Sequence, residues 1–290
     1  MYSEIASNKR KTWLIMAMFL VLIGALGWLF SGVYGEPGFF YLALVFGGVY
    51  ALIQYFAAAK MALALNGARE VTKKEEPRLY RVVENLAITT GMPTPKVYVI
   101  DDPAPNAFAT GRDPKHAAVA ASRGLLNVME KDELEAVMAH EMGHVKNYDI
   151  RVMMIVFGLV AAIGLIADMF LRMMWFSDRD RNVSPIFLVL GIVAAILAPL
   201  IAVLVQLAVS RRREYLADSS GALTTRHPEA LARALEKIRD HGSSMKRQNT
   251  ATAHLFFANP LKGKSLGKLF STHPPVEDRI KRLRQMGTHA

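Results

Sequence analysis

Cysteine is absent from this chain of 290 residues. Its absence excludes a disulfide scaffold, a thiolate metal site and a cysteine nucleophile. Acidic residues are fewer than basic ones, and the formal net charge is +10. A basic chain can bind nucleic acid, or it can be a membrane protein with Lys and Arg on its cytoplasmic side. Basic residues are not interleaved with aromatic ones as on a single-strand binding surface, so nucleic acid is not an expected partner.

Charge is almost missing from four long apolar stretches, at residues 13–30, 39–59, 152–171 and 186–209. Each is close to the ~20 residues that cross the hydrocarbon core of a bilayer as a helix. The first follows a basic cluster, as a signal peptide does, but no small-x-small cleavage site follows it. We interpret it as an uncleaved anchor. For the last two stretches, a buried helical hairpin is the alternative to membrane spans.

The basic residues orient these predicted spans. Three precede the first span, none lies between the first and the second, and three lie in the loop 171–185. Thirteen lie in residues 60–151, and sixteen follow residue 210. The positive-inside rule therefore places the N-terminus (1–12), the segment 60–151 and the segment 210–290 in the cytoplasm. The chain is predicted to be a multi-pass protein of the cell membrane whose two large polar segments can pack as one domain.

Shorter patterns fill the polar segments. Apolar residues at helical spacing predict helices over 75–92, 131–149, 211–224, 227–242 and 272–286. Runs rich in β-formers predict strands over 95–101 and 116–122, and the Pro- and Gly-punctuated stretch 101–115 predicts a short edge strand between two turns. The predicted fold is a mainly α-helical membrane protein with four transmembrane helices and a cytoplasmic α+β domain that contains a small sheet with an edge strand.

The stretch HEMGH, at 140–144, has the residues of a hydrolytic zinc site. His140 and His144 are four apart on the predicted helix 131–149, so both imidazoles can bind one Zn²⁺ at ~2.0–2.1 Å. Glu141 lies beside the metal, where it can take a proton from the attacking water and pass it to the leaving amine. Gly143 leaves room for a substrate backbone. The motif alone also fits a helix with two surface histidines.

A catalytic zinc site needs a third ligand and an open position. No third histidine follows His144 closely, so the ligand must come from elsewhere in the chain. EYLAD, at 214–218, offers Glu214 as the third ligand. Asp218 is four residues further along the same helix and can accept the outer N–H of a ligating histidine. An ordinary surface pair with a neighbouring arginine is the alternative for these acids.

HEMGH, a membrane hairpin and EYLAD together resemble the HtpX branch of the membrane zinc endopeptidases, which are related to the CAAX prenyl proteases. The resemblance covers nearly the whole chain. It implies a gluzincin-type metalloprotease domain assembled from residues 60–151 and 210–290, with one Zn²⁺ per chain. Two further motifs are similar to this family: PNAFATG at 105–111 and STHPP at 271–275.

These two motifs imply roles for three more residues. Asn106 would hold the substrate backbone at an edge strand, and His273 or Arg279 would assist the metal in stabilising the oxyanion. Without the resemblance, Asn106 is a turn residue and His273 is a surface histidine near a helix start.

The resemblance implies a zinc endopeptidase that cleaves cytoplasmic regions of misfolded or damaged membrane proteins, or unfolded polypeptides, beside the lipid bilayer, with self-cleavage as a further activity. One alternative is a prenyl-protein endopeptidase, whose relatives carry more spans. A non-catalytic membrane scaffold with a structural metal is another. Few polar residues lie inside the spans, which argues against a transporter. The sequence leaves the oligomeric state open.

Overall fold

The computed structural model describes residues 2–176, 211–241, 244–247, 252–258 and 274–287. The predicted fourth span, 186–209, and His273 lie outside these ranges. The helices are α1 (Tyr2–Tyr34), α2 (Gly38–Leu65), α3 (Pro77–Thr90), α4 (Arg123–Val128), α5 (Lys131–Lys146), α6 (Asp149–Phe176), α8 (Arg211–Thr225), α9 (Pro228–His241) and α11 (Val276–Gly287). Two 3₁₀ turns are η1 (Pro114–His116) and η2 (Ala253–Leu255). The strands are β1 (Ala68–Glu70), β2 (Lys96–Ile100), β3 (Ala107–Gly111) and β4 (Ala117–Ser122).

A small mixed sheet lies within the α/β domain. Its strand order is β1-β2-β4-β3, with β2 and β4 parallel and the two outer pairs antiparallel. Every residue of β4 is buried, because helices and loops cover both faces of this inner strand. β3 is an edge strand, as the sequence predicts for 101–115, and it packs against α5 and α6. The sheet therefore presents its β3 edge next to the helix that carries HEMGH.

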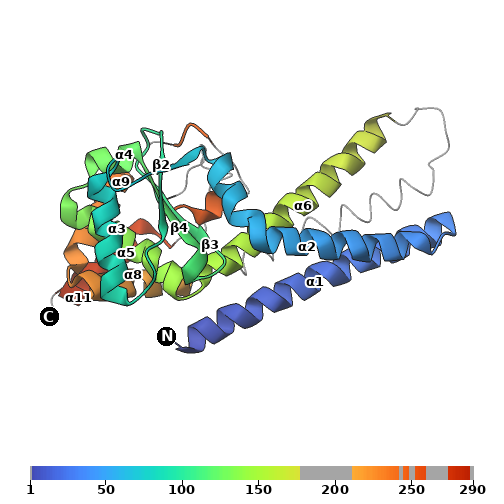
Figure 1. Cartoon of the computed structure of the whole chain (residues 1–290), viewed down its shortest axis with the longest axis horizontal. Helices are drawn as coiled ribbons and strands as arrows, with labels where there is room; N and C mark the ends of the chain where they lie inside the picture. The colour runs from blue at the N-terminus through green and yellow to red at the C-terminus, as the bar shows by residue number, and fades with distance from the viewer. Residues whose placement is uncertain (1, 177–210, 242–243, 248–251, 259–273, 288–290) are drawn as a thin grey trace.

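Helices α1, α2 and α6 extend away from the α/β domain (Figure 1). Among the residues that the structure describes, two segments are long and apolar enough to cross a membrane, Glu4–Leu29 and Gly38–Leu65. Large apolar side chains on them are open to the surroundings, including Trp28 at 69% and Phe46 at 69% exposure. Such a surface would be unfavourable in water and fits lipid. The two leading spans of the prediction thus correspond to α1 and α2.

The boundaries of these long helices differ from the predicted ones. α1 begins at Tyr2 and so includes the residues expected to form a separate N-terminal segment, and α2 continues to Leu65. The third predicted span lies within α6, whose first turns bury Ile155 and Leu159 against α1. The first turns of α1 and the last turns of α2 also contact the α/β domain, through Asn8 and Ala62 respectively.

The helix expected over 131–149 is interrupted, so that prediction is wrong at its end. α5 ends at Lys146, Tyr148 adopts a left-handed conformation with φ 61°, and α6 starts at Asp149. A non-glycine residue in this region is strained by about 1 kcal/mol or more. The turn brings Asp149 back toward α5, and the site described below depends on that return.

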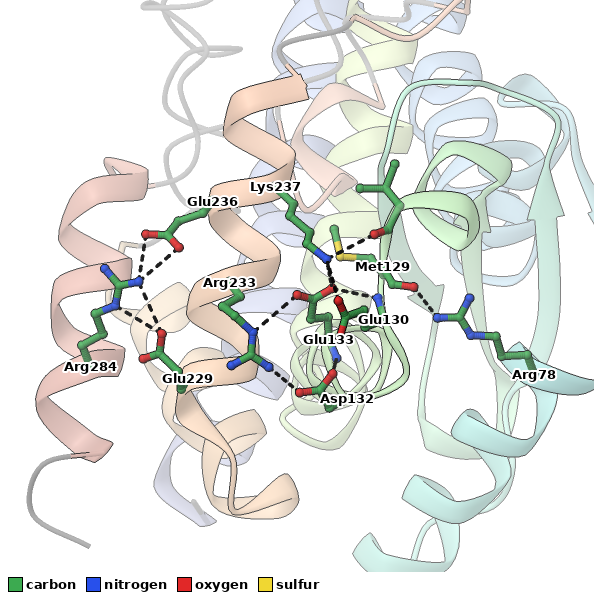
Figure 2. Close-up of polar contacts among 11 residues, drawn as sticks. Arg78, Met129, Glu130, Asp132, Glu133, Glu229, Arg233, Glu236, Lys237 and Arg284 are labelled. Carbon is green, nitrogen blue, oxygen red and sulfur yellow. Dashed lines mark hydrogen bonds and ion pairs between the residues drawn. The ribbon is translucent and has the colours of Figure 1, made fainter.

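The start of α5 is held by a charged network (Figure 2). Glu133 is 1% exposed; it accepts a 2.7 Å hydrogen bond from the backbone of Glu130 and a 2.7 Å bond from Lys237 of α9. Arg233 of α9 pairs with Asp132. On the opposite side Arg78 of α3 donates to the carbonyl oxygens of Leu126 and Met129. These contacts fix α5 between α3 and α9.

Candidate active site

Helices α5 and α8 bring the three predicted ligands together. Nε2 of His144 lies 3.2 Å from Nε2 of His140 and 3.5 Å from Oε1 of Glu214. Nε2 of His140 lies 3.8 Å from Oε2 of Glu214. All three residues are buried, and they form a group able to hold a metal ion. The sequence prediction that these side chains share one site agrees with this arrangement.

A close approach of α8 to α5 makes this convergence possible. A Cβ atom added at Gly221 of α8 would lie 3.1 Å from the backbone nitrogen of His140, so the absence of a side chain there lets the helices meet. Gly143 of α5 faces Ala217 of α8, whose Cα lies 3.5 Å from where a Cβ would be. The expected room for a substrate backbone at Gly143 is thus filled by α8, and that detail of the prediction is wrong.

Each histidine is oriented by its own carboxylate. Nδ1 of His140 lies 2.9 Å from Oδ1 of Asp218, the pairing that the sequence predicted for this acid. Nδ1 of His144 lies 3.0 Å from Oδ2 of Asp149. A carboxylate accepts a hydrogen bond from the nitrogen it faces, so each Nδ1 carries a hydrogen and the neutral imidazole directs the lone pair of its Nε2 inward. Two histidine lone pairs that converge with a carboxylate form the donor set of a cation site.

Arg279 of α11 holds the carboxylate behind His140. It is 1% exposed, and its Nε and Nη2 donate to Asp218 at 2.8 and 2.6 Å. Its Nη1 lies 3.9 Å from Oε2 of Glu214. Burial by itself would raise the pKa of Asp218, but Arg279 and His140 together outweigh it and lower that pKa to about 2. Arg279 therefore lies in the site, as predicted, and its hydrogen bonds are directed at Asp218.

The two histidines differ in proton affinity in the metal-free chain. Burial is the main cause that lowers the pKa of His140 to about 4. Burial also disfavours the charged form of His144, but the hydrogen bond that it donates to Asp149 and the negative charges of Glu214 and Asp149 raise the pKa of His144 to about 9. At neutral pH His144 therefore carries a second proton, on Nε2, which faces Nε2 of His140 and Oε1 of Glu214. A metal ion bound between these atoms would replace that proton.

Glu141 follows His140 on α5 and is 2% exposed. Successive helical residues point about 100° apart, so Glu141 lies beside the ligand group. Its negative charge contributes to the raised pKa values of both His144 and Arg279. The Glu141 carboxylate is therefore close enough to His144 and to Arg279 to stabilise the charged form of each.

Asn106 lies immediately before β3 and is 3% exposed. Its side-chain Nδ2 donates to the carbonyl oxygen of Ala258 at 2.8 Å, and its Oδ1 accepts from the backbone N–H of Ala258 at 3.1 Å. We call residues 252–258 the strap. The sequence predicted that Asn106 holds the backbone of a substrate; in this structure its amide holds the backbone of Ala258, a residue of the same chain.

Three site residues escaped the sequence analysis. Asp149 was missed because the predicted helix ran unbroken to residue 149. The one signal for it in the sequence is a carboxylate five positions after His144. Asn8 of α1 and Phe257 of the strap reach the site only through tertiary packing, and the sequence carries no pattern that marks them.

The chain is similar to known proteins over most of its length. Residues 73–287 match the model of Peptidase family M48. The chain is 54% identical over 288 residues to the protease HtpX homolog of Tropheryma whipplei (strain Twist), covering 99% of both chains. It is 44% identical over 299 residues to the protease HtpX homolog of Streptococcus pneumoniae (strain Hungary19A-6), covering 99% of this chain and 100% of the other.

A solved structure has a similar fold. The crystal structure of S. mikatae Ste24p aligns with a TM-score of 0.54 and 20% identity, covering 98% of this chain and 67% of that one. The chain belongs to peptidase family M48. The resemblance to the HtpX branch is confirmed, and the chain is a membrane metalloprotease.

Proposed function

We propose that this chain is a zinc endopeptidase that cuts extended polypeptide segments at the cytoplasmic face of the cell membrane. The observation that supports this most strongly is the convergence of His140, His144 and Glu214. Their facing donor atoms are 3.2, 3.5 and 3.8 Å apart. Two donor atoms that each lie ~2.05 Å from a tetrahedral Zn²⁺ are about 3.3 Å from one another. The spacing of the three donor atoms is close to this value, so the group fits a zinc ion.

Each residue then has one task. His140, His144 and Glu214 would hold one Zn²⁺, which supplies Lewis-acid polarisation of the scissile carbonyl and of water. Glu141 takes the proton of the attacking water and delivers it to the leaving amine. Asp218 and Asp149 fix the tautomers of the two histidines. Their burial keeps water from competing for these hydrogen bonds.

The sequence analysis expected either His273 or Arg279 to assist at the oxyanion. The guanidinium of Arg279 donates two hydrogen bonds to Asp218, which supports a positioning role for Arg279. We assign the oxyanion contact to His273, which the family resemblance suggests. It would donate a hydrogen bond to the oxygen on which negative charge develops.

The substrate would bind as an added strand at β3. The carbonyl oxygen of Ala107 and the amide of Asn106 bind backbone rather than side-chain groups of the strap. Such contacts suit β-augmentation, in which main-chain hydrogen bonds give affinity for many sequences. An enzyme that binds the main chain of its substrate in this way can act on locally unfolded segments of many sequences.

The position of the site suggests the substrate class. α6 begins at Asp149, in direct contact with the ligand His144, and α1 reaches the same place through Asn8. We therefore propose that cytoplasmic regions of misfolded or damaged membrane proteins are cut here, with self-cleavage as a second outcome. We also propose that both termini and the protease domain, residues 60–151 and 210–290, lie in the cytoplasm, which the distribution of basic residues favours.

Metal content and proteolysis measured together test this function. The detergent-purified protein should contain about one zinc per chain and should cleave casein. A chelator should abolish both, and added Zn²⁺ should restore both. Cleavage that persists in the metal-free protein would contradict the proposal, as would a purified protein that binds no zinc at all.

A further inference from the structure

The strap lies along the edge of β3 that β4 leaves open. The backbone N–H of Phe257 donates to the carbonyl oxygen of Ala107 at 2.8 Å, and Phe256 faces Phe108 in an antiparallel bridge. The next residue, Ala258, makes the two hydrogen bonds with Asn106 described above. The strap is therefore bound as a short strand at the place proposed for the substrate.

These contacts and a substrate strand exclude each other. The Asn106 amide both donates to and accepts from the backbone of Ala258, and the Ala107 carbonyl oxygen accepts from the backbone N–H of Phe257. A second strand on the same edge would need the same groups. A substrate can therefore use them only after the strap has left.

The side chain of Phe257 shows what this position accepts. Its ring meets the ring of His140 edge-on, with centroids 4.9 Å apart and planes at 86°. The guanidinium of Arg279 lies 4.8 Å from the centroid of the same ring. A cation over an aromatic ring and an edge-to-face ring pair both favour an aromatic side chain over an aliphatic one of equal size.

The neighbouring phenylalanine has another role. The ring of Phe256 lies 5.0 Å from that of Phe108, centroid to centroid. Successive strand residues point to opposite faces, so Phe256 anchors the strap on the sheet while Phe257 points toward the metal ligands. Recognition beside the ligands thus depends on Phe257.

We propose that the strap is an internal substrate mimic. It occupies the substrate edge of β3 with an aromatic side chain against His140 and Arg279, and substrates are extended segments with an aromatic residue at that position, which bind by displacing it. This inference rests on the proposed function and extends it to a substrate preference. Because the strap is part of the same chain, it competes at a high effective concentration and raises the apparent KM.

A first experiment compares casein cleavage by the zinc-loaded wild type, Phe257→Ala and the control Ile88→Ala. Ile88 is a large apolar residue of α3 that is 74% exposed. Phe257→Ala should lower KM on the order of tenfold, because the edge of β3 is free in more molecules. Zinc content measured on each variant separates this effect from loss of metal. A zinc-loaded Phe257→Ala protein with wild-type KM and kcat would overturn the inference.

A disulfide can lock the strap in place. Phe108 and Phe256 are opposite each other in an antiparallel bridge, where Cα atoms are close enough for such a bond. Because the chain has no cysteine of its own, the double variant Phe108→Cys/Phe256→Cys has one pair only. Oxidation should stop cleavage with zinc retained, and reduction should restore it. Cleavage by the fully oxidised variant at the rate of its reduced form would contradict displacement.

A peptide tests the preference itself. The blocked hexapeptide of residues 253–258 should inhibit casein cleavage by Phe257→Ala competitively. The same peptide with alanine at the position of Phe257 should inhibit on the order of tenfold more weakly. Equal inhibition by the two peptides, or none by either, would contradict the aromatic subsite. If the wild type itself shows no zinc-dependent cleavage, the proposed function fails instead.

Discussion

The side-chain amide of Asn8 donates a 2.7 Å hydrogen bond to Oδ1 of Asp149, across 141 positions of sequence. The other oxygen of Asp149 faces Nδ1 of His144 at 3.0 Å. Asn8 is fully buried and also donates to the carbonyl oxygen of Asn147 at 2.9 Å. The first helix of the chain, α1, thus holds the carboxylate that orients His144, one of the three proposed metal ligands.

This contact predicts that Asn8→Ala weakens zinc binding without touching a ligand. Loss of the carboxylate that faces a ligating histidine typically costs 10–100-fold in metal affinity. Asn8 supports that carboxylate and not the histidine, so we expect a loss near the lower end, about tenfold. The exposed Asn85→Ala variant of α3 is the matched control. The measurement is competition with a chromophoric chelator, and an unchanged zinc affinity in Asn8→Ala would show that α1 does not support the site.

The buried pair of Asp218 and Arg279 predicts a large effect on stability. Asp218→Ala would leave the Arg279 guanidinium, 1% exposed, without its two short hydrogen bonds. Breaking a buried ion pair in this way costs about 3–5 kcal/mol. Chemical unfolding of the metal-free protein in detergent measures this loss as a change in the free energy of unfolding. The double variant Asp218→Ala/Arg279→Met removes the unpaired charge and should therefore lose less stability than the single variant. A larger loss of stability in the double variant would contradict the buried ion pair as the cause.

The raised pKa of His144 predicts how zinc binding depends on pH. Below its folded pKa of about 9, His144 of the metal-free chain carries a proton that the metal must displace. Zinc affinity should therefore rise about tenfold per pH unit between about 6.5 and 9 and level off above. For the metal-free protein the sign is opposite: the stabilisation from charged His144 is complete below about 6.5 and is lost as the pH rises through about 9.

Calorimetric titration in buffers of different ionisation enthalpy counts the released protons. About one proton per zinc at pH 7 is expected for this site. Zinc binding that is independent of pH between 7 and 9 would show that His144 is already neutral in the metal-free chain.

The membrane orientation is tested by cysteine labelling. Lys74 in the α/β domain and Glu36 between α1 and α2 are both exposed, and the chain has no native cysteine. An impermeant thiol reagent added to intact cells should label Glu36→Cys and leave Lys74→Cys unlabelled until the cells are opened. The reverse pattern would overturn the cytoplasmic placement of the protease domain.

Local spacing made the ligand set predictable from the sequence. Residues four apart on a helix face the same way whatever the tertiary structure, so His140 with His144, and Glu214 with Asp218, could be paired in advance. The edge strand at β3 was likewise marked by the turns that flank it. These features depend on contacts within a few residues, which sequence patterns report well.

The remaining features depend on packing between distant segments. Tyr148 takes a left-handed conformation that its residue type does not favour, and this break places Asp149 against His144. Asn8 and Phe257 reach the site from α1 and from the strap, and neither residue stands in a motif. The start of α1 at Tyr2 was missed because apolar length alone defines a predicted span and not the helix that contains it.

The most direct test of the account compares Glu141→Gln with Glu135→Gln, a partly exposed glutamate of the same helix. Glu141→Gln keeps the size of the side chain but removes its basicity, so zinc should stay bound at about one per chain. Casein cleavage should fall by about 10²–10⁴-fold, the scale for losing a positioned base, while Glu135→Gln should cleave like the wild type. Near wild-type cleavage by a zinc-loaded Glu141→Gln protein would contradict the proposed mechanism.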